Sequence, residues 1–140
     1  MKVSDVMTRR VVAATPDASC QEVAKKMLSG FFSGMPVVDA EQRVIGVVSE
    51  FDLINAMKGK EQPGICNVTA GEIMSKNPIC LEENAAVEEA IELMTEHHFI
   101  RLPVVRAGKL VGVISRSDIL RAFVADSFVT IQEGEITGYE

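Results

Sequence analysis

Apolar residues along the chain follow two different spacings, and the two alternate in a fixed order. The stretches that begin at Cys20 and at Val87 carry apolar side chains at positions i, i+3, i+4 and i+7. This spacing lines one face of a helix and predicts an amphipathic helix in each stretch. Short runs rich in β-branched residues surround the helices and predict strands. These runs are residues 11–14, 36–39, 43–48, 78–81, 103–106 and 109–114.

The second and third strands of each set are joined by a short polar loop, which predicts a β-hairpin. In the second set, Gly108 suits a turn position that requires a positive φ. A further helix is predicted after each hairpin, at residues 50–57 and 116–123. Each set therefore has the order β-α-β-β-α.

The two sets are an internal repeat. They align with an offset of 67 residues, which falls to 66 after the loop at 40–43, and 14 of about 55 aligned positions are identical. Two such units can bury the exposed faces of their sheets against each other. We therefore predict an α/β fold in which two β-α-β-β-α repeats pack with pseudo-two-fold symmetry. The predicted boundaries are a first repeat at 1–60, a linker at 61–69, a second repeat at 70–125 and a tail at 126–140.

Composition narrows the class of protein. Hydrophobic residues make up 47% of the 140 residues and aromatic residues 5%, so the core is expected to be aliphatic. The net charge is −6, and the deficit lies entirely after residue 66. No basic stripe is visible, so we expect no nucleic-acid partner, although local basic residues could bind one small anion.

The cysteines and the lengths of the apolar runs indicate in which cellular compartment the protein is expected. The three cysteines, Cys20, Cys66 and Cys80, include no CxxC pair and predict neither a disulfide framework nor a zinc site. No secretory signal and no run of 18 apolar residues is visible, so we expect no membrane insertion and a cytoplasmic location.

A seven-residue phrase, Gly-x-x-Ser-x-x-Asp, occurs at 46–52 and again at 112–118. In the structural interpretation, each serine caps the helix that follows, and the aspartate reaches back to the serine's backbone N–H. In the functional interpretation, the same helix start binds a phosphate and the carboxylate accepts hydrogen bonds from two neighbouring ribose hydroxyls. Spacing alone does not decide between them, but the repetition favours a nucleotide site where the two units meet.

Four segments of the chain, which include both copies of this phrase, together resemble a tandem pair of cystathionine-β-synthase (CBS) domains, also called a Bateman module. The resemblance is carried by "VMTRRVVAATPDAS", "GMPVVDAEQRVIGVVSEFDLINAM", "IMSKNPICLEENAAVEEAIELM" and "IRLPVVRAGKLVGVISRSDILRAF", and it covers about residues 1–124. It implies a module that binds an adenosine-containing ligand, such as AMP, ADP, ATP or S-adenosylmethionine, between its repeats. It also implies regulation of an effector protein and association into a homodimer, with no cofactor required.

The resemblance carries ligand-binding roles to particular positions. Ser49 and Asp52 would serve one site, and Ser115 and Asp118 the other. Arg101 stands where related pairs often place a phosphate-binding side chain, whereas its counterpart in the first repeat is Gly34. The two sites should therefore differ, and the one with Arg101 suits phosphate better. Contacts to the adenine are expected from the first strands and from the residues around Pro-Val-Val, namely Val12, Ile79, Met35, Leu102 and Pro103.

Other signals are weaker. The pair His97–His98 suggests a metal ligand, but neighbouring helical residues point about 100° apart, which favours a structural or surface role. No nucleophile stands near an obvious base, and no P-loop or GxGxxG is present, so we expect no catalysis and no metal site. Two functions remain open: a regulatory module that binds an adenosine ligand, or an assembly module with vestigial sites that only dimerises or docks a partner. The tail at 126–140 could form an added strand, contact a partner or fray.

Overall fold

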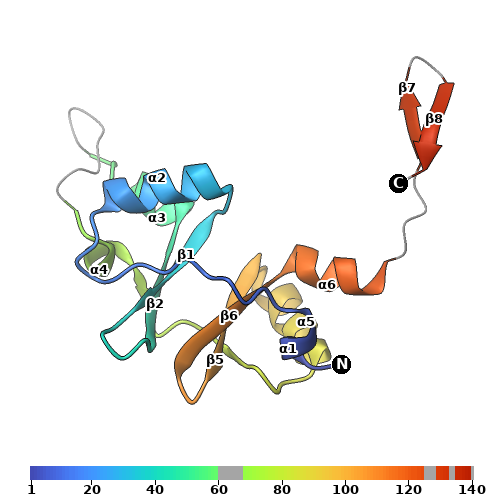
Figure 1. The fold of residues 1–140 in the computed structure, drawn as a ribbon. Helices are drawn as coiled ribbons and strands as arrows, with labels where there is room; N and C mark the ends of the chain where they lie inside the picture. Colours follow the sequence, from blue (N-terminus) through green and yellow to red (C-terminus); the bar gives the residue numbers. More distant parts are fainter. Residues whose placement is uncertain (60–67, 125–128, 133–134, 140) are drawn as a thin grey trace.

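Two small α/β lobes lie side by side in the structure, a computed structural model that describes residues 1–59, 68–124, 129–132 and 135–139 (Figure 1). The first lobe contains helix α2 (Cys20–Gly30), strands β1 (Gly34–Val38) and β2 (Val44–Ser49), and helix α3 (Glu50–Asn55). The second contains strand β4 (Leu81–Glu82), helix α5 (Val87–His97), strands β5 (Arg101–Arg106) and β6 (Lys109–Ser115), and helix α6 (Arg116–Phe123). The predicted helices and hairpins of both repeats are therefore confirmed.

Short elements that the pattern did not predict stand ahead of each repeat. They are helix α1 (Val3–Val6), helix α4 (Ala70–Ile73) and strand β3 (Ser75–Lys76). Beyond the second lobe, strands β7 (Val129–Gln132) and β8 (Glu135–Tyr139) form an antiparallel hairpin, so the tail has strands but they pair with each other. The predicted linker at 61–69 falls largely on residues outside the described ranges, as does Cys66.

The predicted first strands are shorter than the apolar runs that indicated them. In the second repeat, only Leu81 of the run 78–81 is in a strand, where it pairs in parallel with Val104 of β5. In the first repeat, the prediction of a strand at 11–14 is wrong except for a single bridge between Ala14 and Val37. The physical reason is that residues 8–13 cross between the two sheets, so their backbone groups do not stay beside one partner strand (Figure 1).

The two lobes exchange their leading segments. Val3 and Met7 belong to the core of the second lobe, where they pack with Leu81, Val87 and Ile114. In the same way, Ala70 belongs to the core of the first lobe, and Ile73 and Met74 pack against it. Each core is thus completed by residues from the other half of the chain, which joins the two repeats into one unit.

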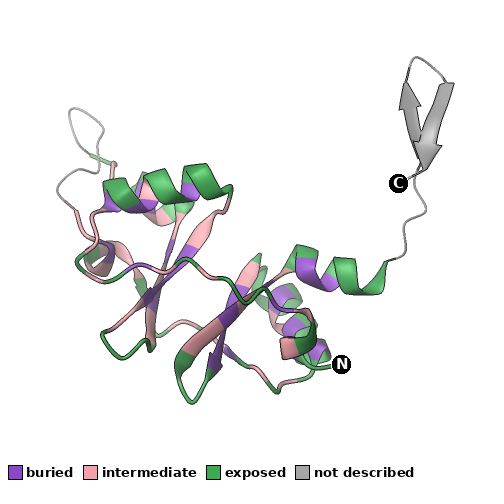
Figure 2. Ribbon diagram, viewed as in Figure 1, coloured by how far each residue is buried: buried purple, intermediate pink, exposed green. Residues whose placement is uncertain are grey.

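Backbone pairing follows the same exchange and shows the pseudo-symmetry. Thr8 pairs with Val113 of β6, with N–H···O distances of 2.8 and 2.9 Å. The equivalent residues in the other lobe, Ser75 and Val47, pair in the same antiparallel way. Burial is concentrated on the inner sheet faces and the inner sides of the helices, while the outer helix faces are exposed (Figure 2). In the described part of the chain, no helix has the length and apolar character needed to span a bilayer.

Candidate ligand-binding site

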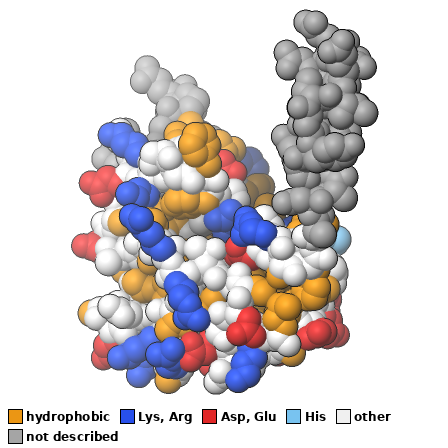
Figure 3. Space-filling model, turned by 45° about the vertical axis from the view of Figure 1, so that its right-hand side comes forward, with side chains coloured by type: hydrophobic (Ala, Val, Ile, Leu, Met, Phe, Trp, Pro, Cys, Tyr) orange, Lys and Arg blue, Asp and Glu red, His pale blue; other side chains and the backbone are white. Residues whose placement is uncertain are grey.

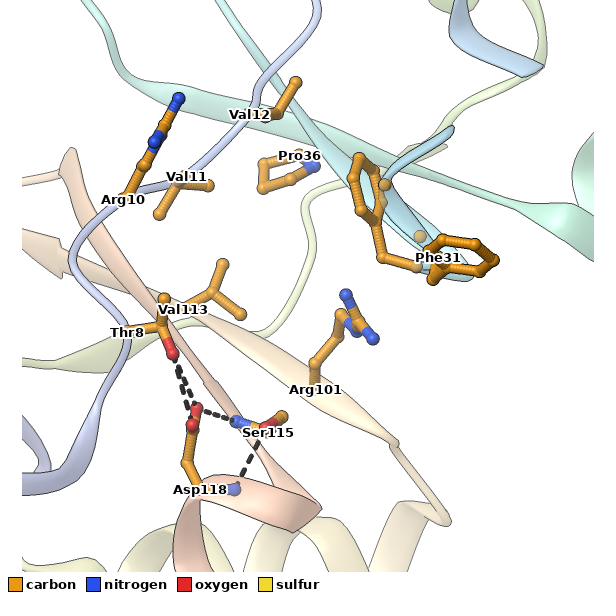
Figure 4. Close-up of a pocket in the computed structure, with 13 residues that line it drawn as sticks. Thr8, Arg10, Val11, Val12, Phe31, Pro36, Arg101, Val113, Ser115 and Asp118 are labelled. Carbon is orange, nitrogen blue, oxygen red and sulfur yellow. Dashed lines mark hydrogen bonds between the residues drawn. The ribbon is translucent and has the colours of Figure 1, made fainter. Parts of the chain in front are cut away.

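A cavity of about 290 Å³ lies between the two lobes, on the side where the crossing segment 8–12 runs (Figure 4). Four parts of the chain form its walls: the crossing segment, the end of α2 with the start of β1, strands β5 and β6, and the start of α6. The side chains that matter for chemistry are Thr8, Arg10, Arg101, Ser115 and Asp118. The apolar wall is made by Val11, Val12, Phe31, Phe32, Pro36 and Val113.

Asp118 is the buried charge of the site, with 6% of its surface exposed. It lies in the first turn of α6, where its Oδ2 accepts a hydrogen bond from the Ser115 backbone N–H at 2.9 Å. Its own N–H donates to Ser115 Oγ at 3.1 Å, which completes a capping box. The structural interpretation of the phrase is therefore confirmed for this repeat. It does not exclude a ligand role, because one carboxylate offers about four acceptor positions.

A residue from the other end of the chain also contacts Asp118. The Thr8 hydroxyl donates to Oδ1 at 3.1 Å (Figure 4). Arg121 Nη1 lies 3.2 Å from the same oxygen. Thr8 stands 110 residues before Asp118 in the chain, so only the segment exchange brings the two together. A hydroxyl group already bonded to this carboxylate shows that the site geometry suits hydroxyl donors.

Arg101 places a positive group beside the cavity. Its Nε is buried and has no hydrogen-bond partner, and its side chain runs from the strand beside Ser115 toward Phe31 (Figure 4). Buried polar atoms almost always have a partner, and a guanidinium group beside a cavity can donate charge-assisted hydrogen bonds, so Arg101 is a candidate to bind an anion. Arg10 lines the same cavity from the crossing segment. The net charge of −6 does not prevent this, because lysine and arginine side chains are spread over the face shown in Figure 3.

The predicted site residues separate into two groups. Val12, Arg101, Ser115 and Asp118 meet in this one cavity. Met35 and Leu102 do not line it, because each is only 2% exposed and packs into the core of its own lobe. Ile79, Pro103, Ser49 and Asp52 do not line it either. They are the repeat equivalents of Val12, Pro36, Ser115 and Asp118, so pseudo-symmetry assigns them to the opposite side of the module.

The positions around Ser49 and Asp52 offer fewer groups that could bind an anion. Ser49 and Asp52 form the same capping box, with the Ser49 backbone N–H donating to Asp52 Oδ2 at 2.8 Å. The Ser49 hydroxyl also donates to that oxygen, at 2.9 Å. The counterparts of Arg10 and Arg101 are Asn77 and Gly34, so both guanidinium groups are missing. This group can act as a helix cap without having the features of an anion site.

Several cavity residues were not predicted from the sequence. Thr8 and Arg10 have no motif of their own, and they reach the site only through the crossing of residues 8–13 between the sheets. Val113 lies on β6, inside the repeated phrase but at one of its unspecified positions. Pro36 lines the cavity where the prediction placed its neighbour Met35. A signal for it existed, since a β-strand turns neighbouring side chains to opposite faces and Met35 follows the apolar core pattern.

The two neighbouring histidines, His97 and His98, each have a structural role. His97 stacks on Phe99 with ring centroids 5.1 Å apart, and His98 ends α5 in a left-handed conformation at φ 58°. Within the described ranges, no three His, Cys, Asp or Glu side chains gather in a way that could hold a metal ion.

Comparison with known proteins places this geometry in a family. The model of the CBS domain matches residues 3–59 and 70–125, so the chain belongs to the CBS domain family and carries a tandem pair of these domains, a Bateman module. The CBS domain-containing protein YhcV of Bacillus subtilis is 32% identical over 121 residues, which span 84% of this chain and 81% of YhcV.

Solved structures share the fold. The crystal structure of CBSX2, a protein of Arabidopsis thaliana, in complex with AMP has a TM-score of 0.77 at 28% identity and covers 86% of this chain and 94% of its own. The CBS domain pair of protein MJ0100, in complex with 5′-methylthioadenosine and S-adenosyl-L-methionine, has a TM-score of 0.75 at 25% identity and covers 88% of this chain and 95% of its own.

Proposed function

We propose that the chain is a non-catalytic regulatory module that binds an adenosine-containing ligand in the cavity beside Asp118. The observation that carries the proposal is the pairing of a buried carboxylate with an unpartnered buried guanidinium nitrogen of Arg101 across one inter-lobe cavity. Support comes from CBSX2 and MJ0100, whose structures hold AMP and two adenosine derivatives respectively.

Each part of such a ligand has a matching group. The ribose hydroxyls donate to Asp118, taking the kind of hydrogen bond that Thr8 now makes. The base packs against the aliphatic wall that includes Val12 and Val113. The 5′ substituent extends toward Arg101, Ser115 and the start of α6, whose backbone N–H groups and dipole favour negative charge.

The charges of the cavity favour a phosphorylated nucleotide over S-adenosylmethionine. Two arginine residues, Arg10 and Arg101, line the cavity, and Asp118 is the acidic side chain among its lining residues. A phosphate gains charge-assisted hydrogen bonds from these groups, whereas a sulfonium cation is repelled by them. AMP, ADP and ATP are therefore the preferred ligands of this site, and the positions around Asp52 bind more weakly or not at all.

Regulation follows if the ligand prefers one arrangement of the two lobes. Because both lobes and the crossing segment line the cavity, occupancy shifts their relative position, and an effector protein responds to that shift. The module acts as a homodimer, and we place it in the cytoplasm. The alternative is an assembly module with vestigial sites, and the unpartnered Arg101 nitrogen argues against it.

Thermal unfolding tests the proposal. The protein is heated with AMP, ADP, ATP, S-adenosylmethionine or NAD at millimolar concentration. A ligand at about 100 times its dissociation constant adds roughly 2.7 kcal/mol, which should raise the midpoint by roughly 5–10 °C. We expect the largest shift from a nucleotide phosphate. A folded protein whose midpoint moves with none of the five ligands would favour the assembly module instead.

A further inference from the structure

Phe31, the residue directly after helix α2, is exposed beside the proposed ligand cavity. It is 95% exposed and is one of the residues that line the cavity, so its ring stands at the mouth. The Arg101 side chain runs from its strand toward this ring (Figure 4). A ligand group that extends outward past Arg101 therefore approaches Phe31.

Neither the backbone nor the core explains a phenylalanine at this position. Phe31 has a left-handed conformation, with φ 56° and ψ 42°, and His98 has the same conformation at the equivalent end of α5. Glycine is favoured in this conformation, and a bulky side chain is strained. The ring also adds nothing to the core, because it is almost fully exposed. Strained residues cluster at ligand sites, which favours a role for Phe31 toward the ligand of the adjoining cavity.

The positive charge on the Phe31 side of the cavity suits one phosphate group. Arg101 lies on that side, whereas Arg10, the other cationic lining residue, lies on the opposite side (Figure 4). Together with Ser115 and the backbone N–H groups at the start of α6, Arg101 can hold one phosphate. A further phosphate would lie beyond Arg101, against the Phe31 ring, where the described lining residues offer no additional cation.

The aromatic ring makes that outer position unfavourable for an anion. The face of a phenylalanine ring is electron-rich, so it attracts a guanidinium group and repels a phosphate. A phosphate against the ring would also lose bound water without gaining a hydrogen bond. The cavity volume of about 290 Å³ lies at the small end of the range for ligand pockets, which is roughly 300–1,000 Å³. This volume favours a compact ligand.

We propose that Phe31 restricts this cavity to adenosine ligands that carry a single phosphate group, as AMP does. One phosphate fits between Arg101, Ser115 and the start of α6, and the ring closes the way outward. ADP and ATP bind more weakly, because their additional phosphates must lie against the ring. This inference rests on the proposed function and adds which nucleotide the site selects.

Calorimetric titration of AMP, ADP and ATP into the wild type, Phe31→Ala and Phe31→Lys tests the proposal, in buffer without divalent cations so that ATP keeps its full charge. For the wild type we expect AMP to bind about tenfold more tightly than ATP. Phe31→Ala keeps the Cβ but removes the ring, so AMP and ATP should bind with similar affinity. Phe31→Lys places a positive charge where the additional phosphates lie, so ATP should bind about tenfold more tightly than to the wild type.

Phe51→Ala is the matched control, since Phe51 is an exposed phenylalanine on α3 that does not line the cavity. Its three affinities should equal those of the wild type. A wild type that binds AMP and ATP equally would overturn the role of Phe31 and leave the nucleotide site standing. So would a Phe31→Ala variant that keeps the preference for AMP, or one that loses AMP and ATP alike. A folded wild type that binds none of the three nucleotides would overturn the proposed function as well.

Discussion

Asp52 and Asp118 occupy the same place in two copies of one phrase, but their surroundings differ. Both cap the helix that follows them, and both accept a hydrogen bond from the preceding serine N–H. Asp118 accepts a hydrogen bond from Thr8 and shares its cavity with Arg101, whereas the equivalents of these two residues beside Asp52 are Ser75 and Gly34. The sequence therefore predicted the aspartates and Arg101, but the contact with Thr8 depends on how the chain crosses between the lobes.

At this scale we predict that Arg101→Ala weakens AMP binding about tenfold or more and leaves adenosine binding unchanged. A hydrogen bond to a charged group contributes about 1.5–3 kcal/mol, and adenosine lacks the phosphate that would receive it. Isothermal titration calorimetry with both ligands measures the difference.

Arg106→Ala is the matched control for this test. Arg106 lies at the far end of the same strand, where it is exposed and bonds Glu83. This ion pair raises the pKa of Arg106 and lowers that of Glu83, so both stay charged at neutral pH. Equal losses for AMP and adenosine in Arg101→Ala would show that Arg101 shapes the cavity rather than binding phosphate.

Among the helices and strands, the spacing of apolar residues predicts those elements whose conformation is set by their own local sequence. The apolar spacing in the stretches at Cys20 and Val87 predicted α2 and α5, and the β-branched runs predicted both hairpins. The exchanged segments were not predicted, because α1, α4 and β3 are two to four residues long and too short for a periodic pattern. What marks them is a pair of glycines in the opposing strands, Gly46 and Gly112, which leave room for the crossing chain.

Gly112→Ala tests the close approach of the crossing segment to β6. A Cβ at this position would lie 2.9 Å from the Thr8 carbonyl oxygen and 2.7 Å from Met7 Sδ, so the backbone pair of Thr8 and Val113 must move apart. We expect a loss of about 1–3 kcal/mol in the free energy of unfolding, measured by urea denaturation.

Gly34→Ala is the control for that change. Its Cβ would meet only the Val48 carbonyl oxygen, at 3.6 Å, which is an ordinary contact. Its stability should therefore stay close to that of the wild type. If Gly112→Ala and Gly34→Ala were equally stable, the crossing segment would not pack against β6 as closely as the structure indicates.

At the scale of the molecule, the repeat explains why the site is composite. Each lobe is completed by a segment from the other half, so the cavity draws residues from both: Thr8 and Val12 from one, Arg101 and Asp118 from the other. A ligand held in this cavity contacts both lobes and the crossing segment, and these are the parts that would move relative to one another. The internal repeat predicted the two-fold arrangement, and the differences between its copies, such as Arg101 against Gly34, make the two sides of the module unequal.

We propose that one side of this module, at Asp118, binds an adenosine nucleotide. Calorimetric titration of AMP into the wild type, Asp118→Ala and Asp52→Ala tests it most directly, because both variants lose the same capping box. We expect about one AMP per chain for the wild type and for Asp52→Ala, and no binding for a folded Asp118→Ala. Binding that survives in Asp118→Ala, or that is lost in Asp52→Ala instead, would contradict it.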